Sequence, residues 1–165
     1  MVKIIMKNLS PSLIQYNKEV NEILNTEQMQ KTKQFVQHGK VSVFSHSVAV
    51  ADYSCRVARK LRLKADYRSL VRGALLHDFF LYDWHDDWDL LHGFKHPRMA
   101  LENASKQFEL NKKERNIIRK HMWPMTFINI PTCKEAWLVC MVDKYCSLLE
   151  TFKIFRYNYE KEFIL

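Results

Sequence analysis

The sequence predicts an all-α fold, a compact bundle of helices. Of its 165 residues, 47% are hydrophobic, while only 3 are Gly and 4 are Pro, which favours a packed helical chain over a β-sandwich or a disordered one. In several segments the apolar residues also recur at helical spacing. The length suits one domain with a sizeable core, so we expect a single domain over residues 1–165.

Composition also narrows the setting in which the protein works. The chain has no run of about 18 apolar residues, as a membrane-spanning helix needs, and residues 1–10 lack the apolar region of a signal peptide. We therefore expect no membrane partner and a cytoplasmic protein. Free thiols in a reducing cytoplasm explain the cysteines better than disulfides or a zinc knuckle, because none forms a Cys-x-x-Cys pair. The cysteines are Cys55, Cys133, Cys140 and Cys146.

The formal net charge of +8 is of the sign that nucleic-acid-binding proteins carry. However, the Lys and Arg residues are spread over several helix-like segments, and no basic stretch is interleaved with aromatic residues for base stacking. We interpret them as solvated helix faces and disfavour a nucleic-acid partner. The same positive field would attract a small phosphorylated substrate.

Two helices are expected before the strongest one. The first spans about 10–25 and opens with Ser10-Pro11, a typical helix start. Thr26 opens the second, which continues through Val36 until Gly39 closes it. The first of the two is loosely amphipathic, with its apolar residues at Leu13, Ile14, Val20, Ile23 and Leu24.

The segment 42–62 predicts a central helix, because it is apolar almost all round. Its His46 shares a face with apolar residues and so points into the core, where a lone histidine is more often a hydrogen-bonded core residue than a ligand. Asp66 caps the next helix, about 67–78, which ends in His77-Asp78. A carboxylate enclosed by apolar neighbours is costly unless something compensates it, and a divalent cation would do so.

The stretch 79–95 fits neither a strand nor a helix period and is rich in Trp and Asp. It predicts a long ordered loop, of the kind that is often functional. His96-Pro97 then begins a helix, with the proline where a first turn tolerates it. For the tail, 152–165, we make no structural prediction.

Two further helices complete the predicted bundle. Asn111 caps a helix of about 112–123, whose inner face carries His121. The last strong helix spans about 132–151 and places Asp143 on an apolar face. Helices of a bundle can aim such side chains at one point, as bundle metal sites do.

Together these elements bring four imidazoles and two carboxylates to inward positions. One metal would be satisfied by fewer ligands, whereas six with a carboxylate able to bridge suit two metals about 3.5–4 Å apart. Imidazole with carboxylate suits Fe, Mn, Zn or Ni, among which the sequence does not choose. The candidate ligands are His46, His77, Asp78, His96, His121 and Asp143.

The order and context of these residues resemble the HD-domain superfamily of metal-dependent phosphohydrolases over about 38–150. The contexts are Ser45-His46-Ser47, Leu76-His77-Asp78, Lys95-His96-Pro97, Lys120-His121 and Val142-Asp143-Lys144. The resemblance implies an all-α bundle of the HD type, flanked here by a helical extension over 1–37 and a tail over 151–165.

The resemblance also implies roles for the residues. His46, His77, Asp78 and Asp143 would hold a first divalent metal, and Asp78 would bridge to a second held by His96 and His121. A hydroxide between the metals would attack phosphorus in line, while the metals hold the phosphate oxygens. The implied partner is a small phosphorylated substrate, for which a nucleotide is one candidate.

The residue three positions after the His77-Asp78 doublet departs from the better-known branches of this superfamily. The branch that cleaves cyclic dinucleotides has Lys there and the nucleoside-monophosphatase branch has Glu, but this chain has Leu81. The branch acting on the stringent-response alarmone has an acidic pair just after the doublet, which Phe80-Leu81 replaces. None of these substrates is therefore assigned.

A proton donor to the leaving group must come from elsewhere or from water. Asp83 and His85 in the loop are candidates, although solvated or packing roles are the alternative. Lys144, Lys95 and Arg98 are candidates to bind phosphate, with a solvated face as the alternative. We name Asp78, Asp83 and Lys144 as the catalytic candidates, and we interpret His38 and His92 as incidental.

Three other residues in the loop, Tyr82, Trp84 and Trp88, would form a lid, stack on a base or simply pack. The first functional hypothesis is a phosphohydrolase acting on a small phosphate ester. A metal-stabilised module that binds a nucleotide or a partner without turnover is the main alternative, and a di-iron oxygenase is the other.

Overall fold

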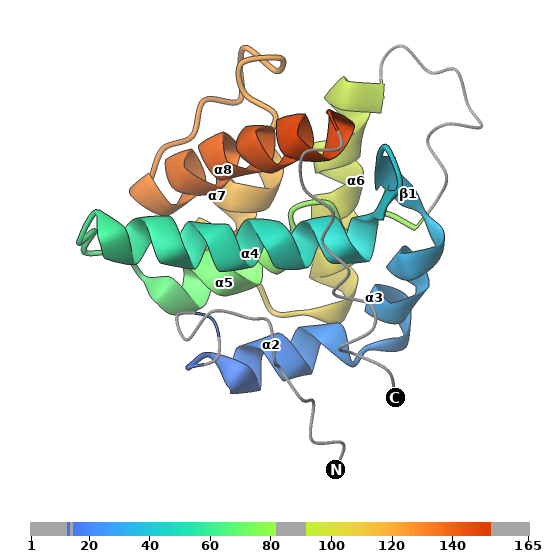
Figure 1. Ribbon diagram of the computed structural model, residues 1–165, viewed down its shortest axis with the longest axis horizontal. Coiled ribbons are helices and arrows are strands. Elements are labelled where there is room, and N and C mark those ends of the chain that lie inside the picture. Colours follow the sequence, from blue (N-terminus) through green and yellow to red (C-terminus); the bar gives the residue numbers. More distant parts are fainter. Residues whose placement is uncertain (1–12, 14, 82–91, 153–165) are drawn as a thin grey trace.

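The computed structural model describes residues 13, 15–81 and 92–152. Helix α4 (Val43–Lys60) runs through the middle of the molecule and packs against α5 (Tyr67–Leu76) on one side and α8 (Lys134–Thr151) on the other (Figure 1). Helix α7 (Lys112–Lys120) contacts both α5 and α8, and so closes the bundle. The predicted all-α bundle is confirmed.

Further elements cover two other sides of this bundle. Helix α2 (Asn17–Leu24) lies against α5, and α6 (His92–Gln107) packs mainly on α7 (Figure 1). Between α2 and α4 the chain forms α3 (Glu27–Lys31), then the 3-10 turn η1 (Thr32–Gln34). Among the described residues, no helix is both long enough and apolar enough to cross a membrane.

Side-chain caps fix where the main helices begin. The Ser42 side chain accepts a hydrogen bond from the backbone N–H of Ser45 at the start of α4, and Asp66 does the same for Ser69 in α5. Asn111 and Glu114 form a reciprocal capping box at α7. Such caps each stabilise a helix by about 0.5–2 kcal/mol. They also fix the register of each helix, and hence the face on which its polar residues lie.

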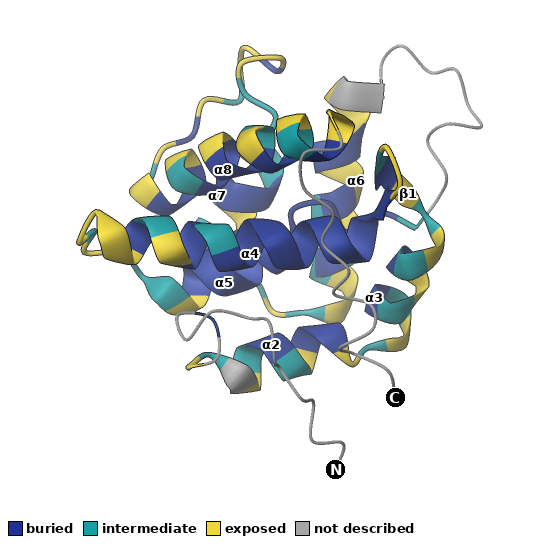
Figure 2. Ribbon diagram, in the orientation of Figure 1, coloured by how far each residue is buried: buried dark blue, intermediate teal, exposed yellow. Residues whose placement is uncertain are grey.

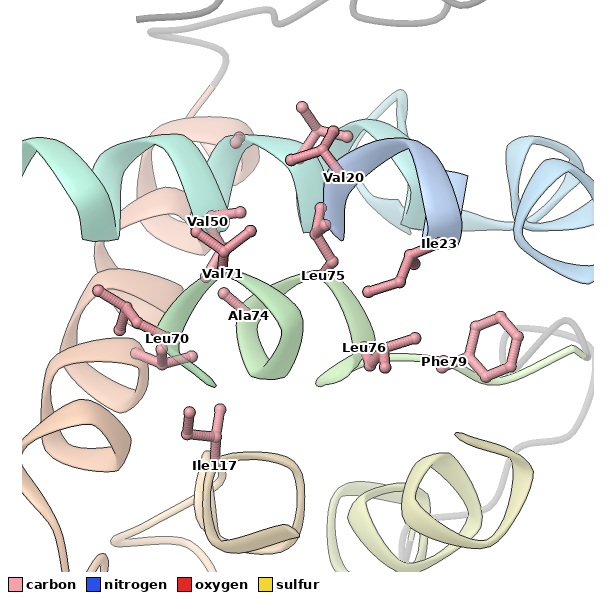
Figure 3. Packing of buried hydrophobic residues seen from close by; sticks show 14 of the residues in the cluster. Val20, Ile23, Val50, Leu70, Val71, Ala74, Leu75, Leu76, Phe79 and Ile117 are labelled. Atoms are coloured by element: carbon pink, nitrogen blue, oxygen red, sulfur yellow. The ribbon is translucent and has the colours of Figure 1, made fainter. Parts of the chain in front are cut away.

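The core lies between α2, α4, α5, α7 and α8, where the helices are buried along their facing sides (Figure 2). Figure 3 shows Val20 from α2, Val50 from α4, Leu75 from α5 and Ile117 from α7 around this centre. Helices α5 and α7 approach closely at Gly73, because a Cβ atom there would lie 2.5 Å from Cδ1 of Ile117. Only glycine permits this helix spacing without rearrangement.

The predicted helix from Thr26 to Gly39 is wrong in its second half. After η1 the chain forms a hairpin of β1 (Val36–His38) and β2 (Val41–Ser42), paired antiparallel. Gly39 has a φ of +59°, a left-handed conformation that suits a tight turn as well as a helix end. The β-branched valines at the strand starts favour extended backbone, so a helix stop signal was in fact a hairpin turn.

The start of α6 also differs from the prediction. The helix begins at His92 and not at His96-Pro97, so Pro97 lies inside it. The missing N–H of a proline costs one bond to the residue four positions earlier, and only about one turn precedes Pro97. His96 is therefore a helical residue, and the predicted loop is shorter at its C-terminal end.

The cysteines are all free: three are buried and Cys133 is partly buried. The predicted helix start at Ser10-Pro11 and the tail from residue 153 onward lie outside the described residues.

Candidate metal centre

Six side chains from separate parts of the chain meet inside the bundle, and none is more than 5% exposed. The first turn of α4 carries one, the residues directly after α5 carry two, and α6 and α8 carry one each. The last follows the end of α7. These are the predicted residues, which the fold brings together: His46, His77, Asp78, His96, His121 and Asp143.

Four of them form a first ligand group, defined as His46, His77, Asp78 and Asp143, whose ligand atoms lie within 4.8 Å of one another. The Asp143 Oδ1 atom is 3.1 Å from His46 Nε2 and 3.6 Å from His77 Nε2. The Asp78 Oδ2 atom is 3.2 Å from His77 Nε2 and 3.7 Å from His46 Nε2. Two imidazoles and two carboxylates thus converge on one small volume.

A second ligand group consists of Asp78, His96 and His121. The other carboxylate oxygen of Asp78, Oδ1, is 3.2 Å from Nε2 of each histidine. The two Nε2 atoms are 2.8 Å apart. Asp78 is therefore shared, with one oxygen toward each group.

Backbone carbonyls fix the orientation of two of these imidazoles. The Nδ1–H of His77 donates to the Ala74 carbonyl at 2.7 Å, and that of His121 donates to the Ile118 carbonyl at 2.8 Å. Because a carbonyl only accepts, the proton must be on Nδ1 in both rings. Each ring can then present the lone pair of Nε2 to a cation.

The electrostatics of the first ligand group favour paired charges. Burial opposes protonation of His77, but Asp78 and Asp143 outweigh it and raise its pKa to about 9. For His46, burial is likewise outweighed by Glu150 and Asp143, and the pKa is well above its ordinary value. Burial opposes ionisation of Asp78 and Asp143, yet the facing imidazoles hold both pKa values well below the usual range.

In the second ligand group, burial has the larger effect on the pKa of His121. It lowers the pKa of His121 in spite of the nearby Asp78 carboxylate. The imidazole is therefore neutral at neutral pH, which is the state that binds a metal. Without a metal, His121 would thus be neutral, whereas His46 and His77 would be protonated.

Several buried atoms of the centre are suited to a cation. Among the described residues, no group makes a hydrogen bond of acceptable geometry to His77 Nε2 or to Asp78 Oδ1. Buried polar atoms are rarely left in that state. Imidazole nitrogens and carboxylate oxygens are the donors that divalent transition metals accept, so these residues fit metal ions.

Two residues that sequence reasoning missed contact the ligand groups from outside. Gln37, on β1, donates from Nε2 to Asp78 Oδ2 at 2.6 Å. Glu150, near the end of α8, lies with Oε2 2.8 Å from His46 Nδ1. Glu150 follows Asp143 by two helical turns on the same face, a spacing that could have indicated it. Nothing in the local sequence marks Gln37.

His38, which we interpreted as incidental, forms a third cluster with His46 and Glu150 whose ligand atoms also lie within 4.8 Å. Its ring meets that of His46 edge-on, with centroids 5.4 Å apart. Burial, and then the charge of His46, lower its pKa. The side chain thus belongs to the surroundings of the centre.

The remaining candidates are placed less directly. Lys144 Nζ donates to the His121 carbonyl at 2.7 Å and lies 3.9 Å from Asp143 Oδ2, with the side chain 34% exposed. Lys95 is exposed on α6, and exposed Arg98 pairs with Glu102 at 2.7 Å. Further candidates lie outside the described residues or, for His92, have no described side chain: Asp83, His85, His92, Tyr82, Trp84 and Trp88.

The fold and the centre define a class of protein, an all-α bundle with buried histidines and aspartates able to hold divalent metals. The family model of the HD domain matches residues 43–148. The chain therefore belongs to the HD domain family, as the order of its histidines and aspartates predicted. No curated protein and no solved structure matched the chain.

The matched range contains all six candidate ligands, whereas Gln37, His38 and Glu150 lie just outside it at its two ends. HD domains bind divalent metals and are generally metal-dependent hydrolases of phosphorylated small substrates. The buried His and Asp cluster of this chain is compatible with that class of chemistry.

Proposed function

We propose that this chain is a phosphohydrolase that uses two divalent metals to cleave the phosphate ester of a small molecule, for which a nucleotide is one candidate. The observation that carries the proposal is the placement of Asp78. Its Oδ2 faces His77 and its Oδ1 faces His96 and His121, each at 3.2 Å. One carboxylate between two ligand groups is the arrangement that a two-metal site requires.

In this proposal His46, His77, Asp78 and Asp143 hold one ion, and Asp78, His96 and His121 hold the other. Bound ions would supply Lewis acidity, which activates water at neutral pH and stabilises charge on phosphate oxygens. The chain itself keeps the donors rigid, because helices and a backbone carbonyl behind His77 and His121 orient each ring. The apolar residues around the centre limit access of bulk water.

Lys144 is proposed to contact a phosphate oxygen of the substrate. Its ammonium group lies beside Asp143 and is partly exposed, so it borders the centre without being enclosed by it. A cation there would stabilise negative charge that develops on the phosphoryl group. Asp83 stays our proposed proton donor to the leaving group.

The test begins with protein purified without a chelating tag, whose metal content is measured by mass spectrometry. Protein reloaded with Mn²⁺ or Fe²⁺ is then assayed against p-nitrophenyl phosphate and a panel of nucleotides and sugar phosphates. We expect about two metals per chain and measurable phosphate release. Asp78→Asn should lose both metals and lower turnover at least about 100-fold, since bound metals contribute several kcal/mol.

Asp52→Asn is the matched control. Asp52 is also a buried aspartate, but it lies on α4 and pairs with Arg56 at 2.7 Å. It should keep metal content and turnover. A fully metallated protein that is inactive over the whole panel would overturn the proposal. Nucleotide binding without turnover would instead indicate a binding module, and oxygen consumption by the iron form would indicate a di-iron oxygenase.

A further inference from the structure

His46 is held differently from the other imidazoles whose Nδ1 contacts are described above. In His77 and His121 the Nδ1–H donates to a neutral backbone carbonyl. In His46 the partner of Nδ1 is the carboxylate of Glu150, at 2.8 Å. The structure therefore provides this ring alone, of those three, with a charged acceptor behind the metal-facing nitrogen.

The two carboxylates nearest to His46 both come from α8. Asp143 Oδ1 is 3.1 Å from Nε2 and Glu150 Oε2 is 2.8 Å from Nδ1. The side chains of Glu150 and His46 are both 0% exposed. A buried carboxylate is costly unless it is paired, and the Nδ1–H of His46 is the partner that the described residues offer to Glu150.

The β1–β2 hairpin packs against the backbone of α8 at Glu150. Gly39, in its turn, lies so close to α8 that a Cβ atom would be 3.1 Å from the backbone oxygen of Glu150. His38, next to it, completes the cluster with His46 and Glu150. The pair therefore lies against a hairpin that precedes the matched HD range, and Glu150 itself stands two residues beyond that range, in the last turn of α8.

We propose that Glu150 is a positioning residue for the metal centre: it accepts the Nδ1–H of His46 and so keeps the Nε2 lone pair directed at the first ligand group. A carboxylate behind a ligand imidazole fixes its tautomer and raises its basicity toward a metal. The inference rests on the proposed metal site, but not on any particular substrate or on turnover.

The experiment measures Zn²⁺ affinity by competition with a chromophoric chelator for the wild type, Glu150→Gln and Glu150→Ala. We expect Glu150→Ala to bind about 10–100-fold more weakly. Glu150→Gln should fall between the two, because the amide oxygen still accepts a hydrogen bond but carries no charge. Gln has nearly the same size as Glu, so a loss of packing alone would leave the Zn²⁺ affinity of Glu150→Gln at the wild-type value. An affinity between those of the wild type and Glu150→Ala therefore reports the lost charge.

Glu135→Gln is the matched control. Glu135 is a buried glutamate on the same helix, 1% exposed, but it accepts from the Asp66 backbone and from Lys113, far along α8 from the centre. It should bind Zn²⁺ as the wild type does. Thermal melts of all variants establish that each is folded.

A second readout does not depend on any variant. In the Zn²⁺-loaded wild type, long-range ¹H–¹⁵N spectra of the imidazoles should show His46 protonated on Nδ1. Protonation on Nε2 would overturn the inference, as would unchanged affinity in folded Glu150→Ala. The inference would also be overturned if Glu150→Gln bound one Zn²⁺ ion fewer per chain than the wild type, because Glu150 would then be a ligand. A wild type that binds no metal would overturn the metal centre itself.

Discussion

The two ligand groups share Asp78 but differ in charge and in support. The first has two carboxylates and two imidazoles with raised pKa values, so without a metal it holds imidazolium–carboxylate pairs. The second has one carboxylate oxygen and two imidazoles whose Nε2 atoms lie 2.8 Å apart, with the pKa of His121 lowered. The first group is internally compensated, whereas the second contains an imidazole, His121, that is neutral at neutral pH.

This difference indicates how the groups would respond to metal. The first must release protons before its Nε2 atoms can bind, but it then offers four ligands and additional support from Glu150 and Gln37. The second contains His121, which is already neutral, but it offers only three ligands. We therefore expect the first group to bind more tightly and with a stronger dependence on pH.

The largest effect should come from Asp143→Ala, which removes the carboxylate that faces both His46 and His77. Loss of a supporting partner already costs about 10–100-fold in metal affinity, so loss of a ligand should cost the first group at least about 100-fold. Chelator competition with Zn²⁺ measures this. A variant that still binds two ions tightly would show that Asp143 is not a ligand.

A smaller effect is expected from His121→Ala, which affects only the second ligand group. The protein should retain one tightly bound ion, and affinity for the second should fall about 10–100-fold. Metal content per chain after dialysis, together with turnover, checks this. If both ions were lost, the two groups would be coupled more strongly than their geometry indicates.

The smallest effect should be the change in stability of the metal-free protein with pH. The pKa of His77, about 9 when the protein is folded, lies above the unfolded value of about 6.5. Its contribution to stability of the metal-free protein is therefore complete below about pH 6.5 and is lost as the pH rises through about 9. Urea unfolding of metal-free protein at several pH values measures this loss.

The same protons compete with metal, so Zn²⁺ affinity of His121→Ala, which isolates the first group, should rise between pH 6 and 8 by up to about tenfold per pH unit for each proton released. In the wild type, the second ion should show a shallower dependence over this range. Equal slopes for the two ions would remove the distinction between the groups.

Much of the bundle was predictable, because α4, α5, α7 and α8 carry apolar residues at helical spacing, and α4, α5 and α7 also begin at clear side-chain caps. The family was predictable from the order of the histidines and aspartates alone. The division of the chain into a core, an extension over 1–37 and a tail over 151–165 stays a prediction, as do the catalytic role of Asp83 and the cytoplasmic location.

The surroundings of the centre were not predictable in the same way. Gln37 and His38 reach the centre from a hairpin, whereas the local sequence predicted a helix end there. The left-handed conformation of Gly39 suits either structure. Glu150 has an ordinary residue type at an ordinary helical position, and its burial depends on the packing of α8 against α4 and the hairpin. Roles that depend on tertiary approach leave little trace in local sequence.

The close approach at Gly73 has a consequence for the centre. Gly73 lies one turn before His77 on α5, and Ile117 lies one turn before His121 on α7. The rings of His77 and His121, one from each ligand group, have centroids 4.9 Å apart. The close packing at Gly73 therefore helps to set the distance between the two ligand groups. We expect a side chain at position 73 to move His77 and His121 apart, and so to alter metal binding through core packing alone.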